Sequence, residues 1–196
     1  MSLINTEIKP FKATAFHNGK FGPVSDADLK GKWSVVVFYP ADFTFVCPSE
    51  LIALDHRIPD FQARNVEVVG VSIDSHFTHN AWRNTPVNAG GIGPVKYTLA
   101  ADITHEIVKA YDVEAGGGVA YRGAFLIDKN GIVRSQIIND LPLGRNMEEL
   151  LRLVDALQFT EEHGEVCPAN WKKGDKGMTA TPDGVASYLA ENADKL

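Results

Sequence analysis

Residues 33–50 read WSVVVFYPADFTFVCPSE, and this stretch decides which fold we expect. Its first part, residues 33–39, is rich in β-branched and aromatic side chains and predicts a buried strand. Apolar residues then recur three or four positions apart, which predicts the inner face of a helix. These residues are Leu51, Leu54, Ile58 and Phe61. Cys47 therefore stands where a strand passes into a helix.

The position of Cys47 has chemical consequences. Pro48 has no backbone N–H and suits the first helical position, which puts Cys47 at the N-cap or within two residues of it. Unpaired N–H groups and the helix dipole favour a thiolate there, and a thiolate is a nucleophile. Thr44 offers a hydroxyl that can accept and donate, and Pro40 closes the strand and can screen the site from water. Taken alone, a single cysteine in an apolar setting is more often an inert apolar side chain than a reactive group.

Length and composition limit the functional classes. The 196 residues fit one domain with a tail. The net charge is −6, and the basic residues are scattered, which argues against nucleic acid or an anionic membrane as a partner. No apolar run approaches the ~20 residues that a membrane span needs. The N-terminus lacks the basic and apolar regions of a signal peptide, so we expect a cytosolic protein.

The N-terminal half predicts a parallel α/β arrangement. Residues 1–32 predict an edge region, with a tight hairpin at Asn18-Gly19 and a brief capped helical turn from Ser25. A second buried strand over residues 66–74 and a capped helix over 75–82 repeat the strand–helix order of the Cys47 region. Pro59 lies inside the first helix, where it should kink the helix or start its final turn afresh.

The C-terminal half predicts a hairpin, a helix and a tail. A short strand over residues 95–100 and a short helix over 104–111 precede the hairpin of strands 124–128 and 132–138. A helix follows over residues 147–159, and a loose helix ends the chain over residues 183–196. We expect an α/β fold, a central mixed β-sheet flanked by helices with an N-terminal hairpin extension. Residues 1–160 form its domain, and residues 161–196 form a C-terminal arm that carries Cys167.

Two features could indicate a ligand but predict none. His76 and His79 could face one side of a helix, yet no further ligand cluster stands beside them, so we expect them to cap or cover the helix start and expect no metal. The glycine-rich loop at residues 90–94 lacks the residues of a phosphate loop, so we expect no bound cofactor.

The motif Pro40-x-x-x-Thr44-x-x-Cys47 resembles the active-site signature of the peroxiredoxins. The sequence FTFVCP at residues 43–48 is similar to the typical two-cysteine class, which contains the alkyl hydroperoxide reductases of the AhpC type. Residues 75–82, the hairpin and residues 163–171 extend the resemblance over nearly the whole chain. Ser49, where threonine is commoner, and Pro59 depart from the pattern. The resemblance implies a thioredoxin-like fold.

The resemblance also implies roles for distant residues. A thiolate in a partly apolar pocket needs a cationic or donor partner. Arg122, just before the hairpin, matches the arginine that supplies one, and Arg145 and Glu50 match a supporting arginine and carboxylate of this class. Gly90-Gly91-Ile92-Gly93 together with Tyr188-Leu189 resembles the elements of members that over-oxidise easily, although Leu189 replaces the usual phenylalanine.

The implied activity is that of a thiol-dependent peroxidase in antioxidant defence and redox homeostasis. Cys47 would attack hydrogen peroxide or an organic hydroperoxide and become a sulfenic acid, with Thr44 and Arg122 stabilising the leaving oxygen. Cys167 of a partner subunit would condense with it into an intersubunit disulfide, after the Cys47 helix locally unwinds. A dithiol reductant, thioredoxin or a flavin-containing disulfide reductase, would then reset the enzyme. The resemblance implies homodimers that assemble into decamers.

Two other functions stay open at the level of sequence. A cysteine hydrolase would pair Cys47 with a histidine such as His56, His76 or His105. A chaperone role of the oligomers would add to the peroxidase activity rather than replace it. Peroxide consumption compared with ester or peptide turnover separates the first alternative from a peroxidase.

Overall fold

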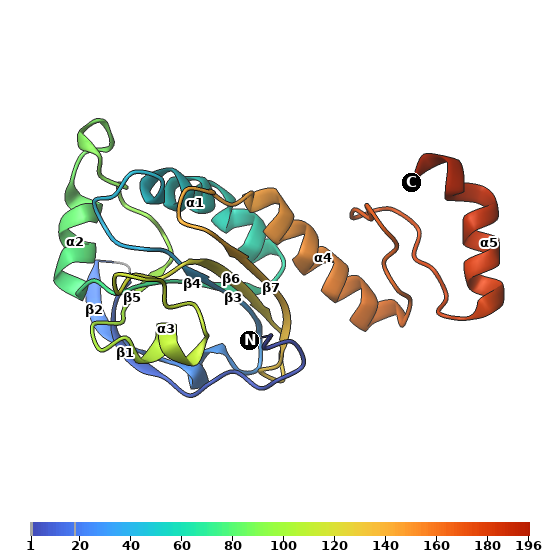
Figure 1. The fold of residues 1–196 in the computed structure, drawn as a ribbon, viewed down its shortest axis with the longest axis horizontal. Coiled ribbons are helices and arrows are strands. Elements are labelled where there is room, and N and C mark those ends of the chain that lie inside the picture. The colour runs from blue at the N-terminus through green and yellow to red at the C-terminus, as the bar shows by residue number, and fades with distance from the viewer. Residues whose placement is uncertain (1, 18) are drawn as a thin grey trace. The chain divides into compact units, whose positions relative to one another are not determined.

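The computed structural model describes residues 2–17 and 19–196. The chain divides into two compact units, Met1–Met147 and Glu148–Leu196. The first unit is built on a seven-stranded mixed sheet with the strand order β2-β1-β5-β4-β3-β6-β7 (Figure 1). In the described residues no helix has the length and apolar character required to cross a membrane.

The centre of the sheet is parallel, as the strand–helix order predicted. β3 (Trp33–Phe38) pairs with β4 (Val66–Ser72), and β4 pairs with β5 (Thr98–Ala101). α1 (Cys47–Ala63) and α2 (His76–Asn84) form the two connections. Parallel strands need such long crossovers. The carboxyl ends of β3 and β4 therefore lie at the same end of the sheet, and the Cys47 loop begins there.

Antiparallel hairpins complete both sides of the sheet. β1 (Lys12–His17) and β2 (Lys20–Ser25) form the predicted N-terminal hairpin; its turn residue Asn18 lies outside the described residues. β6 (Arg122–Ile127) and β7 (Val133–Asn139) form the second, and β6 pairs antiparallel with β3. The predicted capped turn is confirmed as a 3-10 helix, η1 (Asp26–Leu29), in which the Ser25 amide and hydroxyl donate to Asp28.

The core follows the alternation of side chains along the strands. Val36 and Phe38 of β3 share one apolar cluster with Tyr111 and with α3 (Glu106–Ala110). The opposite face of the sheet is covered by α1 (Figure 1). The four predicted inner residues of α1 are all buried, which confirms its amphipathic pattern. They are Leu51, Leu54, Ile58 and Phe61.

The bounds of α1 correct two details. Cys47 is the first helical residue, within the predicted range, but Pro48 is the second helical residue and not the first. The helix also runs through Pro59 to Ala63, so the proline does not start a separate final turn. A short 3-10 helix, η2 (Val87–Ala89), follows α2.

The second unit consists of α4 (Met147–His163), α5 (Pro182–Asn192) and η3 (Ala193–Lys195), with the Cys167 segment between α4 and α5. α4 extends beyond the predicted end at Phe159. The segment after α4 turns back along it, because the Trp171 ring lies 4.9 Å from the Phe159 ring. The functional division into residues 1–160 and 161–196 stays a prediction.

Candidate active site

Cys47 lies at the junction between β3 and α1, and its side chain is 0% exposed. The loop that leads to it passes through Phe43, whose φ of 54° is in the left-handed region. A bulky side chain rarely adopts that conformation, so the loop carries local strain. Such strain is concentrated at functional sites, where the surrounding structure holds it in place.

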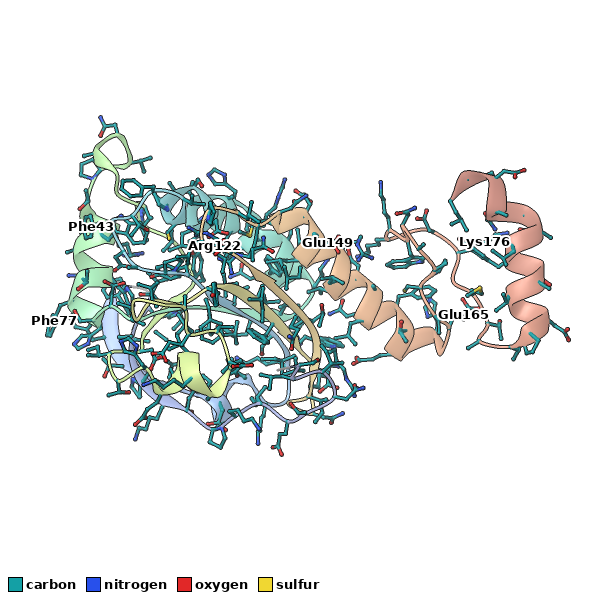
Figure 2. All side chains as sticks on the ribbon, viewed as in Figure 1. Phe43, Phe77, Arg122, Glu149, Glu165 and Lys176 are labelled. Carbon is teal, nitrogen blue, oxygen red and sulfur yellow. The ribbon has the colours of Figure 1, made fainter. Side chains whose placement is uncertain are left out.

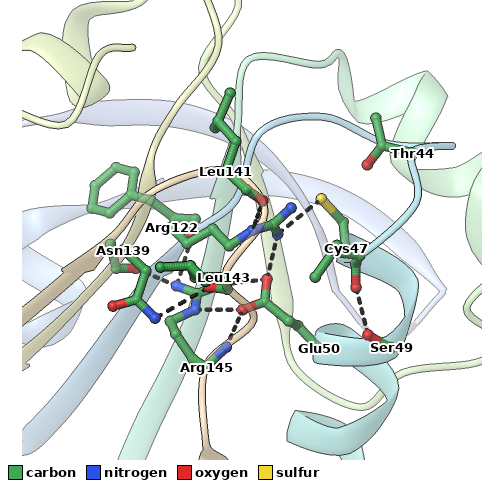
Figure 3. Close-up of polar contacts among 12 residues, drawn as sticks. Thr44, Cys47, Ser49, Glu50, Arg122, Asn139, Leu141, Leu143 and Arg145 are labelled. Carbon is green, nitrogen blue, oxygen red and sulfur yellow. Dashed lines mark hydrogen bonds and ion pairs between the residues drawn. The ribbon is translucent and has the colours of Figure 1, made fainter.

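Arg122 is the residue that reaches Cys47. It begins β6, and the pairing of Ala124 with Val37 brings the start of β6 beside the end of β3. Arg122 Nη1 donates to Cys47 Sγ over 3.4 Å and to Glu50 Oε2 over 2.7 Å, while Nε donates to the Leu141 carbonyl over 2.6 Å (Figure 3). Burial acts to lower the pKa of Arg122, but the hydrogen bonds and charges of Cys47 and Glu50 outweigh it and raise this pKa. The sulfur therefore faces a permanent positive charge.

Glu50 and Arg145 hold Arg122 in position. Glu50 lies one helical turn after Cys47, and Arg145 Nε and Nη2 donate to its two oxygens over 2.8 and 3.0 Å (Figure 3). Arg145 also donates to the carbonyls of Phe38 and Gly123, at the facing ends of β3 and β6. Burial acts to raise the pKa of Glu50, but the hydrogen bonds and charges of Arg145 and Arg122 lower it overall. A charged carboxylate thus lies between two guanidinium groups.

Pro40 and Thr44 lie on the loop before Cys47. Pro40 is buried, and Thr44 Oγ1 donates to the Ala41 carbonyl over 2.8 Å. Among the described residues no hydrogen bond joins Thr44 to Cys47. Since the Thr44 hydrogen is used locally, its oxygen can still accept a hydrogen bond.

Cys167 has a different environment within the second unit. Its side chain is partly exposed, and Sγ donates to the Ala156 carbonyl of α4 over 3.6 Å. Thr160 Oγ1 lies 3.8 Å from the same sulfur. Both cysteines are free thiols in this structure.

A buried polar cluster of Tyr39, Asp42 and His79 was missed by the sequence analysis. His79 was expected to cap or cover the start of α2, but it is fully buried. Its Nδ1 lies 2.8 Å from Asp42 Oδ2, and Tyr39 donates to Asp42 Oδ1 over 2.8 Å. The helix cap is Ser75, which accepts from the Thr78 amide. In the described part of the chain no cluster of side chains could hold a metal ion.

The hydrolase alternative requires a histidine beside Cys47. In residues 2–17 and 19–196 no histidine is a hydrogen-bond partner of Cys47; its partner is Arg122. His105 Nδ1 instead lies 2.9 Å from Glu114 Oε1, and the His76 ring lies tilted against the Phe77 ring with centres 4.1 Å apart. Among the described residues the hydrogen-bond partner of Cys47 is thus an arginine and not the histidine base that a cysteine hydrolase uses.

Comparisons with known proteins agree with this geometry. Residues 4–136 match the AhpC/TSA family, and residues 156–191, which include Cys167, match the C-terminal domain of 1-Cys peroxiredoxin. The chain is 61% identical over 163 residues to an alkyl hydroperoxide reductase C of Helicobacter pylori, covering 83% of this chain and 82% of the relative. It is 50% identical over 183 residues to a peroxiredoxin-2 of Macaca fascicularis, covering 93% and 92% of the two chains.

A solved structure is similar over the same length. The reduced 2-Cys peroxiredoxin of Plasmodium vivax superposes with a TM-score of 0.95 at 47% identity, covering 97% of this chain and 100% of that one. The expected thioredoxin-like fold is thereby confirmed. The chain belongs to the AhpC/TSA family as a 2-Cys peroxiredoxin, a thiol-dependent peroxidase.

Proposed function

We propose that Cys47 is the residue that attacks the peroxide and that Arg122 stabilises the reaction. The observation that carries this proposal is the hydrogen bond from Arg122 Nη1 to the fully buried Cys47 Sγ. A buried thiolate needs such a partner, and a guanidinium keeps its charge at any physiological pH.

The donor inventory of Arg122 supports a binding position for the peroxide. Nε and Nη1 donate to Leu141, Glu50 and Cys47. Within the described residues Nη2 has no hydrogen-bond partner, so two N–H groups beside the sulfur are left for a peroxide oxygen. The thiolate attacks the terminal oxygen, the O–O bond breaks, and the departing oxygen takes the electron pair and then a proton, leaving as water or an alcohol.

In the second step Cys167 of a partner subunit acts as the resolving residue. Its thiol condenses with the Cys47 sulfenic acid, so that a disulfide forms and the hydroxyl leaves as water. The partial exposure of Cys167 supports this role. A dithiol reductant, thioredoxin or a flavin-containing disulfide reductase, then restores both thiols by exchange. In the cytosol such a disulfide would be transient.

Exposed aromatic side chains support assembly with further copies of the chain into dimers and decamers. Phe21 and Phe77 are exposed, and their ring centres lie 5.5 Å apart. Phe43 and Phe77 lie on the side of the unit that carries α2 (Figure 2), and Phe45 is 98% exposed. Exposed apolar groups of this size mark interaction surfaces.

Consumption of hydrogen peroxide and of cumene hydroperoxide with a dithiol donor tests the proposal. Cys47→Ser should abolish both activities, whereas Cys167→Ser, given one equivalent of peroxide and no reductant, should consume it and form no disulfide-linked dimer on a non-reducing gel. Undiminished turnover by Cys47→Ser, or a disulfide-linked dimer in Cys167→Ser, would contradict the assignment.

A further inference from the structure

The loop that carries Cys47 is fastened to the rest of the fold at Asp42. The Asp42 amide donates to Asp74 Oδ2 over 2.8 Å, just after β4, and the same oxygen accepts from Ser72 Oγ. The Asp42 carboxyl group contacts His79 of α2 and Tyr39 at the end of β3. One residue of the loop thus joins three neighbouring segments.

The proton positions in this cluster follow from its partners. His79 Nε2 lies 3.2 Å from the Ala100 carbonyl, which only accepts, so Nε2 carries a hydrogen. Nδ1 faces Asp42 Oδ2, so one further proton lies between these two atoms. Tyr39 donates to the other carboxyl oxygen. Because every member is satisfied, the network is rigid and specific for this loop conformation.

Phe43, the residue after Asp42, shows how the contacts of Asp42 affect the conformation of the loop. Phe43 is held at a φ of 54°, and its ring lies 5.8 Å from the Trp82 ring of α2. A strained residue directly after an anchored one relaxes when the anchor is lost. The anchor therefore keeps the loop in the conformation in which Cys47 meets Arg122.

We propose that Tyr39, Asp42 and His79 form a latch that sets the choice between disulfide formation and a second oxidation at Cys47. This inference rests on the proposed function of the two cysteines. While the loop is closed, Cys47 is fully buried, and a thiol from another subunit cannot contact its sulfur. With the latch closed, a second peroxide can transfer an oxygen to the sulfenate and leave as water or an alcohol, giving the sulfinate. With it open, the Cys167 thiol condenses with the sulfenic acid and water leaves.

Three variants separate the latch from general stability. Asp42→Ala removes it. Asp42→Asn preserves it, because the amide can donate to His79 Nδ1 and accept from Tyr39. Asp128→Ala is the matched control: Asp128 is also buried and accepts backbone N–H groups, but it lies at the end of β6 away from Arg122.

The first measurement is the ratio of sulfinic to disulfide-linked Cys47, determined by mass spectrometry after treatment with a fixed excess of hydrogen peroxide. The second is the rate of the first oxidation and the rate of disulfide formation, both determined by rapid-quench alkylation. Asp42→Ala should lower the ratio and the first oxidation rate by about tenfold each and raise the disulfide rate, as expected for the loss of buried hydrogen bonds. Asp42→Asn and Asp128→Ala should keep the ratio within about threefold of wild type.

Different results would overturn the proposed function and the latch. If wild type itself forms no Cys47–Cys167 disulfide, the proposed function fails. If wild type forms it and Asp42→Ala keeps the wild-type ratio, or Asp128→Ala shifts the ratio equally, only the latch is overturned. Should Asp42→Ala not fold, Tyr39→Phe removes one hydroxyl of the same network and should lower the ratio by about threefold. An unchanged ratio in Tyr39→Phe would then overturn the latch.

Discussion

Glu50 and Asp42 are both buried carboxylic acids within five residues of Cys47 in the sequence, yet their surroundings have opposite effects on their pKa values. Glu50 faces two guanidinium groups, which lower its pKa in spite of burial. For Asp42, burial raises the pKa, and the hydrogen bonds from His79 and Tyr39 compensate only in part. Glu50 is thus held by charge, and we expect Asp42 to act mainly through the hydrogen bonds that it makes with Tyr39 and His79.

The largest effect is expected from Glu50→Gln. Removing one partner of a buried ionic group leaves the other charges uncompensated, so the free energy of unfolding should fall by about 3–5 kcal/mol. Peroxide reduction should slow by about 100-fold, because Arg122 loses the group that orients it. Urea unfolding and initial rates measure both quantities.

Asp42→Asn is the control for this variant and should lower the free energy of unfolding by less than about 1.5 kcal/mol, since its hydrogen bonds can be retained. Equal losses in the two variants would remove the distinction between a carboxyl group that needs its charge and one that needs only its hydrogen bonds.

The dependence of stability on pH should have opposite signs for the two residues. The contribution of Glu50 is complete above its ordinary pKa of 4.5 and is lost as the pH falls through its lowered folded value. Asp42, whose folded pKa lies above the ordinary 3.8, contributes most below 3.8 and progressively less as the pH rises through that folded value.

Urea unfolding of wild type, Glu50→Gln and Asp42→Asn between about pH 3.5 and 7, at constant ionic strength, tests this sign. The stability advantage of wild type should shrink on acidification when compared with Glu50→Gln and grow when compared with Asp42→Asn. Parallel curves would show that neither carboxyl group is coupled to folding as described.

The smallest change in stability is expected when two buried tyrosines are compared, and it tests whether the hydrogen bond to Asp42 contributes. Tyr39 donates to Asp42, whereas Tyr111 is equally buried and its hydroxyl has no partner within the described chain. Tyr39→Phe should destabilise the protein by about 1 kcal/mol, and Tyr111→Phe should be neutral or stabilise it by up to about 1 kcal/mol. Thermal unfolding of the two variants measures this difference, and equal losses would point to packing alone.

The parts that were predictable from sequence are those fixed by local chemistry. The strand–helix junction at Cys47, the inner face of α1 and both hairpins follow from periodicity and turn residues, which act over a few positions. The grouping of Cys47, Glu50, Arg122 and Arg145 came from the motif resemblance. No local pattern joins Arg122 to a sulfur 75 residues earlier, because only the pairing of β6 with β3 brings them together.

The contact between Asp42 and His79 was missed for the same reason, since it spans 37 residues and depends on how α2 packs. One signal was available. His79 and Trp82 are three positions apart and share a helical face, and both are buried. The spacing of His79 to Trp82 indicates a buried face of α2, whereas its spacing to His76 suggested only a position at the helix start.

Pro59 has a consequence for how far opening of the Cys47 loop can spread. Without an N–H, it leaves the Asp55 carbonyl without its intrahelical donor, so the amide ladder of α1 is interrupted inside a continuous helix. Unfolding that begins at the first turn of α1 can therefore stop at the missing hydrogen bond to the Asp55 carbonyl, and the segment around Phe61 remains helical. Amide hydrogen exchange would then report two protection classes along one helix, the faster one on the side of the reactive sulfur.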